Sequence, residues 1–236
     1  MPRITNKKIA SKKSSAQWMS RQLTDPFVAK AKAEGYRCRA AYKIAEIDEK
    51  LRLFKPGQVV VDLGSAPGGW SQYIAKKYPK TRVLAMDLLE MKKIPYSTTP
   101  SAAIAAATPS PAKGTLEQVE FWQGDFTSDE AVAWLNEKLG GRKVDVVLSD
   151  MAPNTTGHQK TDHLRQMVLL EYAWDFAREN LAQGGAFVAK SFTGGTTNEL
   201  LAQIKPAFAK VQHIKPESSR KESVEMFIVA TGFKAE

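Results

Sequence analysis

The sequence predicts an α/β domain built on a mostly parallel sheet, and two observations carry this prediction. Apolar, β-branched segments alternate along the chain with segments of helical periodicity, which is typical of strands joined by helices. The first apolar segment, Val59–Leu63, runs into a turn rich in glycine and proline, after which apolar residues recur at helical spacing. A strand, a glycine turn and a helix in this order bring a bound nucleoside close to bare backbone.

The expected strands are the apolar segments that end in polar or turn-forming residues: Val59–Leu63, Arg82–Asp87, Val119–Gln123, Val144–Ser149, Ala186–Phe192, Ala209–Ile214 and Glu225–Thr231. No helix separates the last two, so we expect them to pair antiparallel. The expected helices show cap signals or an apolar stripe: Pro26–Glu34, Ala40–Leu51, a helix after Gly69, Ser128–Leu139, Asp162–Leu181 and Asn198–Ile204. We expect Asp25 to cap the first of these helices, and Gly184 and Gly185 to end the long one that starts at Asp162.

The 236 residues fit one large domain better than two small ones. Residues 1–16 are rich in lysine and serine and lack periodicity, which predicts a disordered basic tail. The remainder, 17–236, is expected to form a single domain whose first part, 17–55, is a basic helical extension. Residues 95–115 are rich in proline, alanine, serine and threonine, so we expect a flexible surface insertion there, with a short helix at Ser101–Ala107 left open.

The net charge of +9 is unevenly distributed. Residues 1–55 hold 14 Lys/Arg and 5 Asp/Glu, whereas the rest of the chain is balanced. A segregated basic block indicates a partner with a phosphate backbone, and a merely solvated basic tail is the alternative. The candidate ligands for such a partner in this block are Lys30, Lys32, Arg37 and Arg39.

Several features bear on where the protein works. No apolar run is long enough for a membrane helix, and no apolar segment follows the basic N-terminus as in a secretory signal. The single cysteine, Cys38, provides neither an internal disulfide nor a metal cluster, which favours the cytoplasm. An organellar transit peptide stays open. Nothing implies a protein partner, so we expect a monomer.

Polar residues stand at the predicted strand ends, where parallel sheets bind ligands. They are Asp62, Gly64, Asp87, Asp125, Asp150 and Lys190. Asp87 lies about 20 residues beyond the glycine turn, which is where a carboxylate meets ribose hydroxyls in nucleotide sites. Asp125 suits a base-edge amino group, although a turn-capping role is the alternative for both Asp125 and Asp150.

Lys190 interrupts an apolar run in a predicted inner strand. Lysine is rarely buried without a partner, and a buried lysine near other charges can act as a base. The alternative is a side chain that reaches the surface from the strand end.

Four separated blocks of the sequence resemble one family. They are Arg39–Ile44 (RAAYKI), Asp62–Gln72 (DLGSAPGGWSQ), Ser149–Asn154 (SDMAPN) and Glu225–Gly232 (EMFIVATG). The chain resembles, over about residues 15–234, the FtsJ/RrmJ family of S-adenosylmethionine-dependent RNA 2′-O-ribose methyltransferases. The resemblance implies a Rossmann-like class I methyltransferase fold, with a mostly parallel seven-stranded sheet, an antiparallel last strand and helices on both faces. It also implies S-adenosylmethionine as methyl donor and a uridine of 23S ribosomal RNA in the large subunit as target.

The family's catalytic tetrad falls on Lys43, Asp150, Lys190 and Glu225, and its donor-binding positions fall on Gly64, Gly68, Gly69, Trp70, Asp87, Asp125 and Asp150. We expect Lys190 to be the base or to stabilise the developing alkoxide. Lys43 would disfavour the charged form of Lys190 and Asp150 would favour it. Glu225 would hold Lys43 or the substrate ribose. Two departures stand out: the insertion at 95–115 is longer than expected for compact members of the family, and the loop after Lys190 is only loosely similar.

Other functions remain open at this point. Within methyltransferases, a ribose of transfer RNA or of a messenger cap is the alternative substrate. A non-catalytic RNA-binding protein that keeps the fold is disfavoured by the intact tetrad. A nucleotide-dependent oxidoreductase is disfavoured because the turn lacks the G-x-G-x-x-G spacing.

Overall fold

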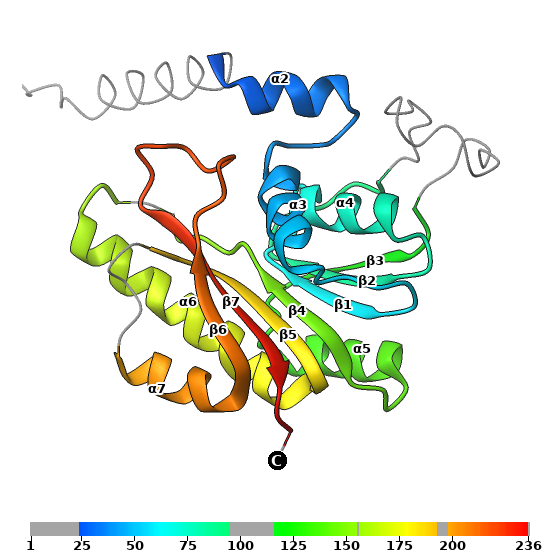
Figure 1. Cartoon of the computed structure of the whole chain (residues 1–236). Helices are drawn as coiled ribbons and strands as arrows, with labels where there is room; N and C mark the ends of the chain where they lie inside the picture. Colours follow the sequence, from blue (N-terminus) through cyan, green and yellow to red (C-terminus); the bar gives the residue numbers. More distant parts are fainter. Residues whose placement is uncertain (1–23, 95–115, 155, 193–197, 236) are drawn as a thin grey trace, which may run out of the picture.

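The computed structural model describes residues 24–94, 116–154, 156–192 and 198–235. Its centre is a seven-stranded sheet with the order β3-β2-β1-β4-β5-β7-β6 (Figure 1). The strands are β1 (Val59–Leu63), β2 (Arg82–Asp87), β3 (Val119–Gln123), β4 (Val144–Ser149), β5 (Leu181–Phe192), β6 (Phe208–Ile214) and β7 (Glu225–Phe233). All seven strands that the sequence predicts are therefore present, three of them with longer bounds.

The direction of the last strand decides which residues meet at one edge of the sheet. Strands β1 to β5 pair in parallel, whereas β7 pairs antiparallel with both β5 and β6. This confirms the predicted mostly parallel sheet with an antiparallel last strand. Because β7 runs the other way, its first residue, Glu225, lies opposite Phe192 at the end of β5.

Helices cover both faces of the sheet, as predicted (Figure 1). They are α2 (Pro26–Ala33), α3 (Ala40–Leu51), α4 (Gly69–Lys77), α5 (Asp129–Leu139), α6 (Gln159–Asn180) and α7 (Asn198–Ala207). Helices α3 and α4 pack one hydrophobic core against the sheet, and α5, α6 and α7 pack another on the opposite face. Among these described helices, none has the length and apolar character needed to cross a membrane.

The start of α2 follows the predicted cap. The Asp25 carboxylate accepts a hydrogen bond of 3.0 Å from the backbone N–H of Phe27, and Pro26 is the first helical residue. Gly35, just beyond the helix, has a φ of 70°, a conformation that glycine adopts without a steric penalty.

The predicted last residue of the long helix, Leu181, is within one residue of the observed end, but the predicted cap by Gly184 and Gly185 is wrong. Helix α6 ends at Asn180, and Gly184 and Gly185 lie inside β5. Leu181 is already extended and pairs with Val144, whereas the next pair joins Ala186 to Val146. The extra residues of β5 between these pairs form an irregularity, and Gly184 with its φ of 79° lies within it. The two glycines therefore serve a strand distortion and not a helix cap.

Two predicted segments lie outside the described residues. They are the disordered basic tail at 1–16 and the flexible insertion at 95–115, the latter including the short helix left open at Ser101–Ala107. Both stay predictions.

A buried carboxylate joins α3 to α4. Asp48 is 2% exposed and accepts hydrogen bonds from the Tyr73 hydroxyl (2.7 Å), the Tyr78 hydroxyl (2.8 Å), the Lys77 ammonium (2.9 Å) and the Phe54 N–H (3.3 Å). This cluster holds α3, and with it Lys43, against the helix that follows the glycine turn.

Candidate active site

The candidate residues gather at the carboxyl edge of the parallel strands. The chain leaves β1 toward β2 and β3, and later continues from β4 toward β5, so the sheet order reverses between β1 and β4. Ligands of open α/β sheets bind at such a reversal, beyond the strand ends. Asp62 and Gly64 lie at this edge from β1, and Asp150 follows the end of β4.

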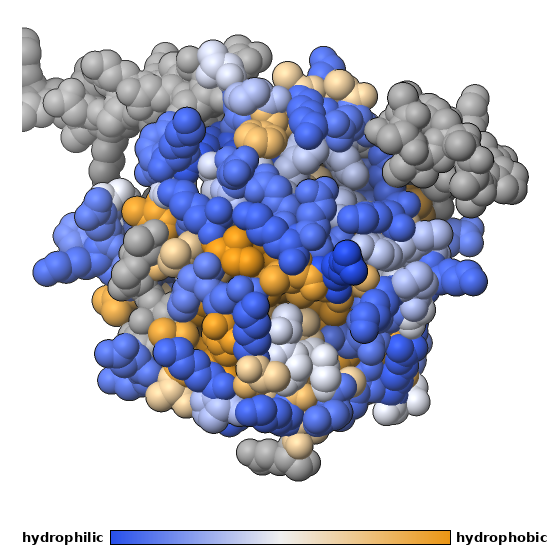
Figure 2. Space-filling model, in the orientation of Figure 1, coloured by the Kyte–Doolittle hydropathy of each residue, from blue (hydrophilic) through white to orange (hydrophobic). Residues whose placement is uncertain are grey.

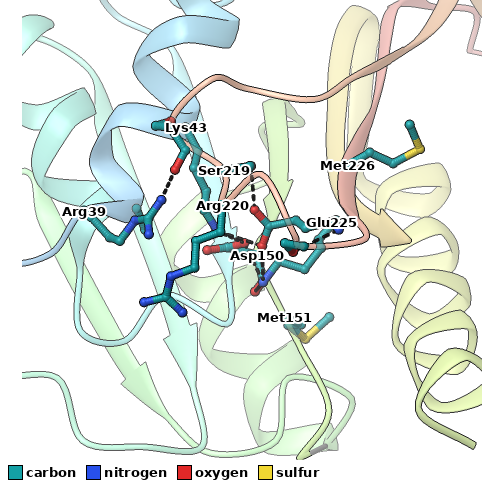
Figure 3. A network of polar contacts seen from close by, with 12 residues as sticks. Arg39, Lys43, Asp150, Met151, Ser219, Arg220, Glu225 and Met226 are labelled. Atoms are coloured by element: carbon teal, nitrogen blue, oxygen red, sulfur yellow. Dashed lines mark hydrogen bonds and ion pairs between the residues drawn. The ribbon is translucent and has the colours of Figure 1, made fainter. Parts of the chain in front are cut away.

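Four charged side chains from distant parts of the chain meet there (Figure 3). The Lys190 Nζ lies 2.7 Å from Asp150 Oδ1 and 3.6 Å from Glu225 Oε2. The Lys43 Nζ lies 2.8 Å from the same Glu225 oxygen and 3.7 Å from Asp150 Oδ1. The structure thus brings together all four residues of the predicted tetrad, as two ammonium groups alternating with two carboxylates.

Burial and pairing together determine the charges in this cluster. Burial by itself lowers the pKa of Lys43, but the neighbouring Asp150 and Glu225 reverse the effect, so this pKa is raised. Burial likewise favours the neutral form of Asp150, but Lys190 and Lys43 hold its pKa below the usual value. The neighbouring charges therefore favour a protonated Lys43 and an ionised Asp150 at neutral pH.

The lysine in β5 is held by more than ion pairs. Lys190 is 7% exposed, and its ammonium also donates to the backbone carbonyl of Asp150 at 2.8 Å. The side chain of Gln166 on α6 donates to the Lys190 carbonyl at 3.0 Å and to the Met151 carbonyl at 3.2 Å. Lys190 therefore points into the cluster and does not reach the surface, contrary to the alternative considered from the sequence.

The glycine turn after β1 leaves no space for side chains. A Cβ at Gly64, whose φ is 73°, would lie 2.5 Å from the Met151 Cγ. A Cβ at Gly68, which caps α4 with a φ of 100°, would lie 2.8 Å from the Met91 Sδ. At Gly69 the nearest atom would be the Cys38 sulfur. Bare backbone at this turn is thus required by packing as well as useful to a ligand.

We predict that Gly64→Ala lowers the free energy of unfolding by about 2 kcal/mol or more, because strain and a clash with Met151 add together. Gly57→Ala is the matched control: Gly57 has a similar φ of 85° but a Cβ there would meet nothing within 4 Å. Strain alone should cost about 1 kcal/mol at Gly57. Urea unfolding measures both, and equal losses would show that the contact with Met151 is unimportant.

Three of the predicted donor-binding residues have different hydrogen-bond partners within the protein. The carboxylate of Asp87 accepts backbone N–H groups of Ala66 and Leu89, both at 2.8 Å, so it organises the glycine turn. One oxygen of Asp125 accepts the N–H and hydroxyl of Thr127, which is the turn-capping arrangement considered from the sequence. The Trp70 indole is buried and donates to the Ala40 carbonyl at 2.8 Å, so its ring is a packing element.

Asp62 is the most deeply buried acid of the site, at 1% exposure. One oxygen accepts the Ser71 hydroxyl at 2.6 Å, and the other has no hydrogen-bond partner among the described residues. Burial raises the pKa of Asp62 to about 7.

The four candidate RNA ligands fall into two pairs. The guanidinium of Arg37 donates to the carbonyls of Pro67 (2.9 Å) and Lys93 (2.6 Å), and that of Arg39 binds Asp25 and the Ser218 carbonyl. Both arginines thus have protein partners. Lys30 and Lys32 on α2 are exposed, although the Lys30 ammonium lies 3.9 Å from a Glu34 oxygen and 4.5 Å from the centre of the Tyr42 ring.

Of two cavities in the described structure, one is lined by predicted site residues and the other is not. A small one of about 170 Å³ opens between α3 and the β6–β7 loop and is lined by Lys43, Arg220 and Glu225, among others. A larger one of about 820 Å³ is lined by residues of α6, α7 and the end of the chain, and none of the predicted site residues contributes to it.

Comparison with known proteins fits this geometry. The model of the FtsJ-like methyltransferases matches residues 36–233. The chain belongs to this family. It is 51% identical over 221 residues to a ribosomal RNA large subunit methyltransferase E of Novosphingobium aromaticivorans, covering 94% of this chain and 89% of the relative. A Bradyrhizobium diazoefficiens protein of the same name is 50% identical over 94% of this chain and 90% of its own length.

A solved structure supports the fold of this FtsJ-like methyltransferase. A putative ribosomal RNA methyltransferase from Plasmodium falciparum superposes with a TM-score of 0.67 and 29% identity. The match covers 85% of this chain and all of the other.

Sequence reasoning missed two residues near the tetrad of this FtsJ-like methyltransferase. Ser219 binds Glu225, and Glu46 binds the loop that carries Ser219. Glu46 lies three residues after Lys43 on α3, and this spacing was a usable signal because such residues share a helix face. Ser219 lies in a loop, and nothing in its local pattern distinguishes it.

Proposed function

We propose that this chain transfers a methyl group from S-adenosylmethionine to the ribose 2′-hydroxyl of a uridine in 23S ribosomal RNA of the large subunit. The observation that carries the proposal is the cluster of Lys43, Asp150, Lys190 and Glu225 beside the glycine turn. Family membership and the names of the relatives support the reaction type and the ribosomal RNA substrate.

The residues present suit S-adenosylmethionine. The glycine turn offers backbone without side chains, and the unpaired buried oxygen of Asp62 suits a ligand that carries positive charge. Gly64, Gly68, Gly69 and the backbone of Trp70 would hold the donor, with Asp87 at its ribose and Asp125 at its base. Asp150 would belong to both the donor site and the tetrad. When bound, the donor supplies an electrophilic methyl group.

The protein's own task is to align the acceptor hydroxyl and to manage its proton. As a neutral amine, Lys190 would accept that proton; as an ammonium, it would stabilise the developing alkoxide by its charge. In either form, Asp150 holds the Lys190 nitrogen in place. Lys43, which remains cationic, is bound by Glu225 and lines the small cavity. We propose that the acceptor nucleotide approaches through this cavity.

Labelled S-adenosylmethionine, large ribosomal subunits and free RNAs test the proposal. We expect label on one 2′-O-methyluridine of 23S ribosomal RNA, found by mapping the modified ribose. Label on transfer RNA alone would favour the alternative substrate, and no transfer to any RNA would favour a non-catalytic RNA-binding protein. Sedimentation of the pure protein tests the expectation of a monomer.

We predict that Lys30→Gln combined with Lys32→Gln weakens RNA binding and flattens its salt dependence. The face in Figure 2 is largely hydrophilic, and these two lysines are exposed on α2. The slope of log K against log salt is negative, and each lost phosphate contact should bring it closer to zero by about 0.7–0.9. Lys205→Gln on α7, at the far end of the molecule (Figure 1), is a control that removes one exposed lysine away from α2, and it should leave the slope unchanged. An unchanged slope in the double variant would remove α2 from the RNA-binding surface.

A further inference from the structure

The loop between β6 and β7 passes directly beside the tetrad (Figure 3). Ser219, a residue of this loop, is 4% exposed, and its hydroxyl donates to Glu225 Oε1 at 2.7 Å. Ser219 is not one of the four charged residues of the tetrad, and its hydroxyl binds a tetrad carboxylate. Its partner is the carboxylate that binds Lys43.

The two oxygens of Glu225 have separate partners. Oε2 lies 2.8 Å from Lys43 and 3.6 Å from Lys190, whereas Oε1 takes the Ser219 hydroxyl. The last torsion of a glutamate is broad, so a carboxylate held by one oxygen can rotate. With both oxygens engaged, the orientation of Glu225 is fixed, and so is the place of the Lys43 ammonium. A hydrogen bond to a carboxylate is also stronger than one between neutral groups.

The loop is in turn anchored to the helix that carries Lys43. The carboxylate of Glu46 accepts the backbone N–H groups of Glu217 and Ser218, the second at 2.9 Å. Arg39, just before α3, binds the carbonyl of Ser218. Helix α3 thus places Lys43 on one side of Glu225 and, through the anchored loop, Ser219 on the other.

We propose that Ser219 is a positioning residue for methyl transfer: its hydroxyl fixes the Glu225 carboxylate, which in turn places Lys43. This inference rests on the proposed function, since it concerns the rate of that reaction. If turnover depends on Ser219, a fifth side chain joins the four of the tetrad. The hydrogen bonds from the loop to Glu46 then also matter for the site, because they hold Ser219 in place.

Ser219→Ala and Ser218→Ala form a matched pair for the test. The Ser218 hydroxyl is buried and has no hydrogen-bond partner among the described residues, and its contacts with Glu46 and Arg39 use backbone atoms. With large ribosomal subunits and labelled donor, we expect Ser219→Ala to lower kcat about tenfold, the loss of one charge-assisted hydrogen bond. The KM for S-adenosylmethionine should stay within about twofold, and Ser218→Ala should match the wild type in both quantities.

A second comparison separates positioning from general damage to the loop. In a Glu225→Ala background the partner carboxylate is gone, so adding Ser219→Ala should lower single-turnover transfer by less than about twofold. Three results would each overturn the inference: wild-type kcat in Ser219→Ala, equal losses in the two serine variants, or an undiminished tenfold loss in the Glu225→Ala background.

Failure of the proposed function is distinguishable from failure of the inference. If the wild type methylates no RNA, the proposed function fails, and crystal structures of wild type and Ser219→Ala decide the inference. A Glu225 carboxylate turned away from Lys43 in the variant would support it, and an unchanged carboxylate would overturn it.

Discussion

Replacing Lys190 by alanine is expected to lower kcat for methyl transfer about 100-fold or more, while the affinity for S-adenosylmethionine stays nearly unchanged. The reason is the place of this ammonium group, buried and bound by the Asp150 carboxylate at 2.7 Å. Loss of a general base typically costs a factor of 10² to 10⁴ in rate. Single-turnover methylation of large subunits measures the chemical step, and calorimetry measures the donor affinity.

A second substitution distinguishes the two roles open to this lysine. Arginine keeps the charge but does not lose its proton in proteins, so Lys190→Arg should be as slow as Lys190→Ala if the lysine takes the proton. Substantial activity in the arginine variant would instead assign Lys190 to stabilising the alkoxide. Lys205→Ala on α7 controls for the loss of a lysine in general. Turnover close to that of the wild type in Lys190→Ala would exclude both roles.

The largest expected effect on stability comes from Asp48→Ala, which should lower the free energy of unfolding by roughly 3 kcal/mol. The substitution leaves the buried Tyr73 hydroxyl without its acceptor and removes the partner of Lys77 and Tyr78. For a chain of this size, such a loss should lower Tm by roughly 6–12 °C. Glu49→Ala, at the exposed neighbouring position, is the control and should change stability by less than about 0.5 kcal/mol.

The contribution of Asp48 should depend on pH with a definite sign. Burial favours its neutral form, but the hydrogen bonds from Lys77, Tyr73 and Tyr78 outweigh this and lower its pKa. A carboxyl with a lowered folded-state pKa contributes stability above its unfolded value, about 3.9, and loses it as pH falls through the folded value. The difference between wild type and Asp48→Ala should therefore be constant near neutral pH and shrink below about pH 4. A difference that stays constant down to pH 2 would contradict this account.

Local sequence patterns were sufficient for most of the framework. Runs such as Val59–Leu63 and Val144–Ser149 are mostly apolar because both faces of a parallel strand are buried, and their bounds agree with the structure. The role of the two glycines after α6 was not predictable in this way. Helix and strand abut at Leu181 without a turn, and the glycines that resembled a stop signal serve the irregular pairing of β5.

The sequence identified the candidate site residues but not the distances between their side chains. The resemblance named Lys43 and Glu225, which are separated by 182 positions, and their 2.8 Å contact follows only from the antiparallel insertion of β7. Charge counting placed Arg37 and Arg39 among the RNA ligands, whereas the structure gives both guanidinium groups protein partners. A count of charges does not distinguish a side chain that binds a phosphate from one that forms hydrogen bonds within the protein. The catalytic and binding roles stay predictions until the variants are measured.

The position of β7 in the sheet has a consequence for biosynthesis. The last strand to be made lies between β5 and β6 and carries Glu225, so a nascent chain that stops before it has an open gap in its sheet and only three of the four charged groups. Such a chain buries two like-charged ammonium groups against a single carboxylate, which is electrostatically unfavourable. A chain truncated before Glu225 should therefore lack methyl-transfer activity, because it has lost both the strand and the second carboxylate.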